Sequence, residues 1–162
     1  MKRFLPFLLI AVATQAQALK CPEPSVASSF RQAMSSPENY VILRGKFDFD
    51  ATLLPGGPDA RGDPNLPAPA ALPARFVGQS LVEDGFTNDL DIPVTLQPSC
   101  LGPWCGTMTP GQDVMAFATT DGRGTVTLEL NPCGKWTFAD PAQPMLDEML
   151  ACMTGGTCTD AQ

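Results

Sequence analysis

Six cysteines constrain the fold of this chain more than any other feature of its sequence. An even number of cysteines in an exported chain indicates disulfides, and six cysteines allow fifteen pairings. Cys100 and Cys105 flank Gly102-Pro103, and Cys152 and Cys158 flank Gly155-Gly156; such turn formers bring the flanking residues within bonding distance. Cys21 is then left for Cys133. We therefore predict three disulfides, of which the last closes a long loop.

The first eighteen residues predict export. Lys2 and Arg3 precede an apolar run from Phe4 to Val12, and Ala16-Gln17-Ala18 places small residues before a cleavage point, as in a secretory signal peptide at 1–18. The run is shorter than the ~20 residues that a helix needs to cross a bilayer, so we expect no transmembrane segment. The mature chain is expected to begin at Leu19 and to be periplasmic or extracellular.

Length and charge then limit the class of protein. Residues 19–162 are enough for a single domain with one hydrophobic core. Without Lys2 and Arg3, eight Lys and Arg stand against seventeen Asp and Glu, a net charge of minus nine. Such acidity argues against binding to nucleic acid. We expect the partner to be a protein or another component of the cell envelope.

The stretch Cys100-Leu-Gly-Pro-Trp-Cys105 places two cysteines in a turn, which is open to three interpretations. Thiol oxidoreductases place their cysteines three apart at a helix N-terminus, whereas these are five apart. The chain has no histidine, and cysteines in an oxidising compartment pair before they bind zinc, so we expect neither a metal nor a cofactor. We adopt the third interpretation, a structural disulfide. Trp104 then either packs over the bridge or forms an exposed contact, and it is our first candidate for a binding surface.

Patterns of apolar and polar residues predict five strands. Residues 43–50, 90–97 and 125–130 alternate, 114–119 is a short apolar run, and 76–82 is a fifth candidate in which Gly78 indicates a bulge. The tetrapeptide Asp121-Gly122-Arg123-Gly124 predicts a hairpin turn before 125–130. Pro93 indicates that its strand is an edge or is broken there.

Helices are expected near both ends of the chain. Val26, Phe30 and Met34 recur at four-residue spacing after Pro24-Ser25, and Ser35-Ser36-Pro37 ends that segment. Near the C-terminus an apolar stripe is expected to begin at Asp140 or Gln143 and to end at Gly155-Gly156. Its members are Met145, Leu146, Met149, Leu150 and Met153.

Between the first two predicted strands the composition changes. Residues 54–73 contain six prolines and three glycines, which predicts a long exposed loop. Loops on small barrels commonly form binding surfaces, so this loop, with Arg61 and Asp63, is our second candidate. Arg61-Gly62-Asp63 is also an adhesion tripeptide, but we interpret it as a chance occurrence in a loop rich in Gly and Asp.

Five short strands with a helix at each end predict a mostly β protein, a small five-stranded OB-like barrel stapled by disulfides. The stretch Tyr40-Val-Ile-Leu-Arg-Gly-Lys-Phe47, which follows Cys21-Pro22 and a short helix, resembles the first strand of the netrin-like domain of the tissue inhibitors of metalloproteinases. Outside this N-terminal part the similarity is confined to the placement of Cys100, Cys133 and Cys152.

The resemblance implies an OB barrel whose N-terminal segment is tied to the loop after the fifth strand, which supports the pairing of Cys21 with Cys133. In that family a cysteine at the very N-terminus binds the protease zinc through its free amine, and a second cysteine follows two residues later. Here Leu19 and Lys20 precede a single Cys21, so the chelating amine does not carry over. The activity that the resemblance implies is inhibition of a secreted or envelope protease, through loops.

Enzyme chemistry has little support in this sequence. Without histidine, the usual general base and the Ser/His and Cys/His nucleophile pairs are missing. Carboxylates remain, because Asp48 with Asp50, and Asp89 with Asp91, each share one strand face; alternation in an exposed strand also produces such pairs without any function. We therefore expect a non-enzymatic binding module. The alternatives are a protease inhibitor and an envelope enzyme that uses these carboxylates.

Overall fold

The computed structural model describes residues 20–55 and 69–159, and the signal peptide predicted at 1–18 lies outside them. Within the described residues the chain forms two α-helices, one 3-10 turn and eight strands. In chain order they are α1 (Val26–Ser35), β1 (Asn39–Asp48), η1 (Ala51–Leu53), β2 (Leu72–Val82), β3 (Gly85–Pro98), β4 (Cys100–Leu101), β5 (Trp104–Cys105), β6 (Asp113–Thr120), β7 (Val126–Leu130), β8 (Thr137–Ala139) and α2 (Gln143–Met153).

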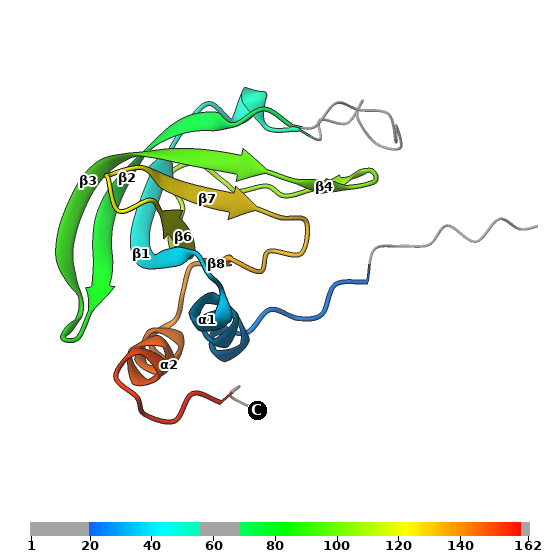
Figure 1. Ribbon diagram of the computed structural model, residues 1–162. Helices are drawn as coiled ribbons and strands as arrows, with labels where there is room; N and C mark the ends of the chain where they lie inside the picture. The colour runs from blue at the N-terminus through cyan, green and yellow to red at the C-terminus, as the bar shows by residue number, and fades with distance from the viewer. Residues whose placement is uncertain (1–19, 56–68, 160–162) are drawn as a thin grey trace, which may run out of the picture.

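Five of the strands close into a ring (Figure 1). In the order β1, β2, β3, β7, β6 each strand is hydrogen-bonded to the next, and β6 pairs with β1 to complete the circle. Neighbours are antiparallel except β3 and β7, which run parallel from Thr95 opposite Thr127 to Pro98 opposite Leu130. β8 pairs with β6 and extends the sheet. The predicted mostly β fold, a small disulfide-stabilised barrel with terminal helices, is confirmed.

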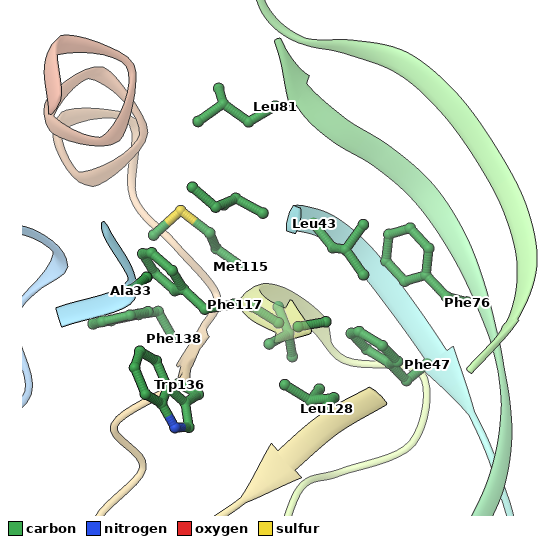
Figure 2. Close-up of a cluster of buried hydrophobic side chains, with 14 of the residues drawn as sticks. Ala33, Leu43, Phe47, Phe76, Leu81, Met115, Phe117, Leu128, Trp136 and Phe138 are labelled. Atoms are coloured by element: carbon green, nitrogen blue, oxygen red, sulfur yellow. The ribbon is translucent and has the colours of Figure 1, made fainter. Parts of the chain in front are cut away.

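Inward-facing side chains of the strands form the core of the barrel (Figure 2), and in β6 five consecutive residues, Val114 to Ala118, are buried. Leu43 and Phe47 of β1 are buried with Phe76 of β2, and the rings of Phe47 and Phe76 lie 4.9 Å apart. This is the arrangement that a two-residue period produces, with one face of the strand buried and the other in solvent. The two helices lie side by side at one end of the barrel, where α2 buries Leu146 and Met149.

All five predicted strands are present, but their bounds differ. β1 is shifted toward the N-terminus, since it begins at Asn39 and ends at Asp48. β2 and β3 form one long hairpin that turns at Glu83 and Asp84 and extends beyond the predicted 76–82 and 90–97. In β3 the pattern missed residues 85–89 because exposed polar residues, Thr87 and Asn88, occupy the strand near the turn; in β2 it missed 72–75, which were partly assigned to the preceding loop. Three short strands, β4, β5 and β8, were not predicted.

Gly78 does not form the predicted bulge, because the register of β2 and β3 shifts between Ser80 and Leu81. Gly78 instead lies directly opposite Gly45 of β1. A Cβ on Gly78 would be 2.7 Å from the Gly45 Cα and would collide with the carbonyl oxygen of Arg44. The glycine pair therefore lets two backbones approach where the barrel wall curves.

Two predictions from turn and edge residues are confirmed. β7 pairs with β3 only from Thr95 onward, so Pro93 lies in a part of β3 that, within the described residues, has a strand on one side alone. Proline has no backbone N–H, and on the unpaired side of an edge strand no hydrogen bond to a neighbouring strand is lost. The turn at 121–124 joins β6 to β7, and Oδ1 of Asp121 accepts hydrogen bonds from the N–H groups of Arg123 (2.8 Å) and Thr125 (3.0 Å).

The two helices occupy the predicted places with two corrections. Ser25 caps α1 by accepting a hydrogen bond from the Ser28 N–H at 3.1 Å, and α2 begins at Gln143, the second of the two predicted starts. Met153, predicted on the apolar stripe of α2, is 42% exposed, because the buried face of that helix runs through Leu146, Met149 and Cys152. Met34, predicted to lie on the buried face of α1, is 58% exposed. Four-residue steps drift around a helix, and the buried face follows steps of three and four through Val26, Ser29 and Ala33.

All three predicted disulfides are present. They join Cys21 to Cys133, Cys100 to Cys105 and Cys152 to Cys158, with Cα–Cα distances of 5.4, 4.0 and 4.6 Å. In the part of the chain that the structure describes, neither helix has the length and apolar content to cross a membrane.

Candidate functional site

A groove of about 500 Å³ lies where three segments distant in sequence meet. One wall is the N-terminal segment before α1, a second is the hairpin of β4 and β5, and the third is the loop that follows β7. Most of the surface that lines it is apolar, although about half of the lining residues carry polar or charged groups. The residues that matter below are Pro22, Pro24, Leu101, Glu129, Pro132 and Lys135.

Two of the three disulfides build the walls of this groove. Cys21–Cys133 fastens the N-terminal segment to the loop after β7, and both Cys100 and Cys133 line the groove. Cys100–Cys105 closes the hairpin of β4 and β5 across two directly opposed residues. The walls are therefore covalently fixed at both sides, which limits the conformational freedom lost when a partner binds.

The base of the hairpin is also held against β7. Ser99 N–H donates to the Leu130 carbonyl oxygen at 2.8 Å, and Gly106 N–H donates to the Ser99 carbonyl oxygen at 2.9 Å. A Cβ on Gly106 would collide with the Leu130 carbonyl group, so only glycine permits this approach. The hairpin is thus a rigid extension of the barrel wall.

Trp104, the first predicted candidate, lies at the tip of this hairpin and is 41% exposed. It is directly opposite Leu101, which is 54% exposed. Opposed residues project from the same face of a strand pair and adjacent residues from opposite faces, so Leu101 and Trp104 lie on one face and the Cys100–Cys105 bridge on the other. Trp104 therefore does not form the predicted lid over the bridge, and its role in a binding contact stays a prediction.

One charged residue of the groove, Glu129, is oriented by a core side chain. It is an exposed residue of β7, and its Oε2 accepts a hydrogen bond from Trp136 Nε1–H (3.2 Å). The Ser99 hydroxyl lies 3.4 Å from both Oε1 of Glu129 and the Leu130 carbonyl oxygen, and its single proton is shared between them. Trp136 itself is buried, and Figure 2 shows it at the edge of the core with its ring nitrogen directed away from the cluster. Lys135 Nζ lies 4.3 Å from the centroid of the Trp136 ring.

The loop after β7 has its own supports. Oδ1 of Asn131 accepts hydrogen bonds from the N–H groups of Cys133 (3.0 Å) and Lys135 (3.3 Å), and the buried Ser29 hydroxyl of α1 donates to the Lys135 carbonyl oxygen at 2.7 Å. The ring of Tyr40 lies 5.1 Å from that of Trp136. Burial of the Tyr40 phenol raises its pKa; a hydrogen bond with Ser36 opposes this, and the nearby charge of Glu129 adds to it.

The second predicted candidate is only partly within the described residues. Arg61 and Asp63 lie outside them, as does most of the loop predicted at 54–73. The predicted C-terminal end of this loop, residue 73, needs correction, because β2 already begins at Leu72. Just before this loop lies the turn η1, which Asp50 caps by accepting hydrogen bonds from the Thr52 N–H (2.9 Å) and hydroxyl (2.7 Å).

The four carboxylates considered for an enzyme are all exposed. Asp89 and Asp91 line one shallow depression on the outside of β2 and β3, without Asp48 or Asp50. Their hydrogen bonds are local: Asp89 accepts one from Gln79 at 2.9 Å, and Asp91 forms a two-point ion pair with Arg75 at 2.7 Å. This arrangement provides no enclosed carboxylate pair and lends no support to the enzyme alternative.

Sequence reasoning missed most of the groove. It identified the cysteines, and Trp104 beside the groove, but not the lining residues Glu129 and Lys135 or the supporting Trp136. The Asn131-Pro132-Cys133-Gly134 stretch was a detectable turn signal, whereas nothing in the sequence indicated that Ser99 and Glu129 meet.

These features define a class of protein, a small disulfide-stabilised β-barrel with two helices at one end and a stapled hairpin beside a groove. Comparison of the chain with protein-family models, with curated proteins and with solved structures gave no match. The function of the groove is therefore inferred from its own chemistry.

Proposed function

We propose that this protein is an exported, non-enzymatic binding module that holds a partner protein at the groove and at the adjoining tip of the β4–β5 hairpin. One observation carries the proposal: Leu101 and Trp104 expose large apolar surfaces side by side on a hairpin fixed at its base. Exposed apolar patches beside a concavity mark interaction sites, and tryptophan is among the residues that contribute most to binding energy.

A double substitution tests this role. Leu101→Ser with Trp104→Ser removes both apolar contacts and leaves the disulfide intact. With the wild-type protein as bait, photo-crosslinking in the envelope fraction followed by mass spectrometry is expected to identify a partner that the double variant captures at least tenfold less. Val77→Ser is the matched control, because Val77 is 52% exposed on β2, away from this tip. Equal capture by the double variant and the control contradicts the proposal.

Export is supported by the predicted signal peptide and is consistent with the three disulfides. N-terminal sequencing of the protein from outside the cytoplasm is expected to begin at Leu19. A protein that retains Met1 in the cytoplasmic fraction contradicts export.

A second candidate function is inhibition of a secreted or envelope protease. It is favoured by the position of the N-terminal segment and the hairpin on one groove, and by the proposed netrin-like, OB-type identity of the barrel. The test is the activity of secreted metallo- and serine proteases with and without the protein in molar excess. A mature N-terminus at Cys21 would favour zinc chelation by the free amine, and one at Leu19 would favour blockage by loops.

A further inference from the structure

Glu129 is a carboxylate that, among residues 20–55 and 69–159, has no cationic partner, and most of the surface of its groove is apolar. Its contacts are two neutral donors, the Trp136 indole and the Ser99 hydroxyl. Among the described residues, no basic side chain forms an ion pair with it. A carboxylate oxygen has about two acceptor positions, so each oxygen of Glu129 retains one for a further donor.

The charge balance of the groove favours a cation. Glu23 of the N-terminal segment lines the same groove, so two carboxylates face one ammonium, that of Lys135. Lys135 Nζ lies over the face of Trp136, which attracts its positive charge. The chain as a whole is acidic, and such a field concentrates cationic partners at a concave surface.

We propose that this groove binds an arginine side chain of the partner protein, whose guanidinium group pairs with Glu129 while a neighbouring apolar side chain of the partner covers Leu101. This inference rests on the proposed function and names the chemistry of the partner. Arginine fits better than lysine because a guanidinium offers two parallel N–H groups to the two oxygens of a carboxylate. The prolines at 22, 24 and 132 supply the apolar surface for the stem of that side chain.

Peptide pools provide the test with the full mature protein. The probe is Ac-X-X-Leu-Arg-Leu-X-X-NH2, with X an equimolar mixture, and matched pools carry Gln or Glu in place of Arg. The two indole N–H signals in a ¹⁵N–¹H spectrum separate the parts of the site, since Trp104 reports on the hairpin tip and Trp136 on Glu129. Trp104→Phe assigns the two signals.

We expect the Arg pool to shift the Trp136 signal and to bind at least tenfold more tightly than the Gln pool, with the Glu pool weakest. Glu129→Gln keeps an acceptor for Trp136 and should abolish the preference for Arg. Glu38→Gln removes the same charge from an exposed position outside the groove lining and should retain the preference. High salt should reduce the preference in the wild-type protein.

Three results would overturn the arginine inference: equal binding of the Arg and Gln pools, an unchanged preference in Glu129→Gln, or no shift of Trp136 with any pool. A shift of Trp104 alone, without dependence on charge, would overturn the inference and leave the proposed binding function standing. If the double serine variant lost partner capture but the Arg, Gln and Glu pools bound equally well, the arginine inference would also fail and the proposed binding function would stand. Failure of capture by the wild-type protein would contradict the proposed function itself.

Discussion

Trp136 Nε1–H donates a hydrogen bond to Oε2 of Glu129 across 3.2 Å. The ring of Trp136 belongs to the core, where it lies 6.0 Å from Phe117, and the carboxylate of Glu129 belongs to the exposed groove. The packing of the core therefore sets the direction of a charged group at the surface. A change in the core at this point is expected to alter the groove as well as the stability.

Replacement of Trp136 by Phe removes the donor and part of the ring. We expect the free energy of unfolding to fall by about 2 kcal/mol, from the lost hydrogen bond and the space left behind. Urea unfolding followed by circular dichroism measures this change. Trp104→Phe is the control, and because Trp104 is 41% exposed its effect should stay within about 0.5 kcal/mol. Equal effects of the two substitutions would contradict the larger contribution predicted for the buried Trp136.

The three disulfides should differ in their contribution to stability. In the loop-entropy account, a sequence separation of 112 residues, as in Cys21–Cys133, corresponds to about 5 kcal/mol, and one of 5 residues, as in Cys100–Cys105, to about 2 kcal/mol. Paired serine substitutions at each bridge, compared by guanidinium unfolding, should show this order. The prediction is wrong if loss of the short bridge lowers the unfolding midpoint more than loss of the long one.

Gly78→Ala tests the close approach of β1 and β2. The added Cβ meets backbone atoms of Arg44 and Gly45, which cannot move aside as a flexible side chain does, so we expect a loss of about 3 kcal/mol or more. Gly122→Ala is the control: its φ of 72° strains an alanine by about 1 kcal/mol, but no atom lies within 4 Å of the new Cβ. Thermal unfolding of both variants distinguishes collision from strain, and a smaller loss for Gly78→Ala would argue against the tight strand contact.

The turn between β6 and β7 should make stability depend on pH. Hydrogen bonds from the backbone N–H groups of Arg123 and Thr125 hold the pKa of Asp121 below its ordinary value of about 3.9. A carboxyl group with a lowered pKa in the folded state stabilises the fold above the unfolded value, and this stabilisation is lost as the pH falls through the folded value. Asp121→Asn should therefore flatten the decline of stability below pH ~4. Chemical unfolding between pH 2 and 6 measures the slope, and identical slopes for variant and wild type would refute the assignment.

The predicted architecture depended on residues close together in the chain. Gly102-Pro103 and Gly155-Gly156 indicated the two short disulfides because a turn brings near neighbours together whatever the rest of the fold does. The same reasoning located Ser25 before α1 and the turn at 121–124. Elimination then assigned the long bridge from Cys21 to Cys133.

The predictions failed where the environment of a residue depends on how it packs in the folded structure. Gly78 read as a bulge because its real contact, Gly45, belongs to another strand. Met34 read as buried because four-residue spacing says nothing about which face of α1 meets the barrel. The face of the hairpin on which Trp104 lies became clear only from its pairing with Leu101 in the structure.

Composition and local spacing were enough to predict the disulfide framework, the alternation that makes one face of β1, β3 and β7 apolar, and the acidic charge. The tertiary structure alone decided the groove. Ser99 follows β3, Glu129 belongs to β7 and Pro22 precedes α1, and they meet because β3 pairs in parallel with β7 while a long disulfide returns the N-terminal segment to that end. Pairing between distant strands is a property of the whole closed barrel, so no short stretch of sequence specifies it.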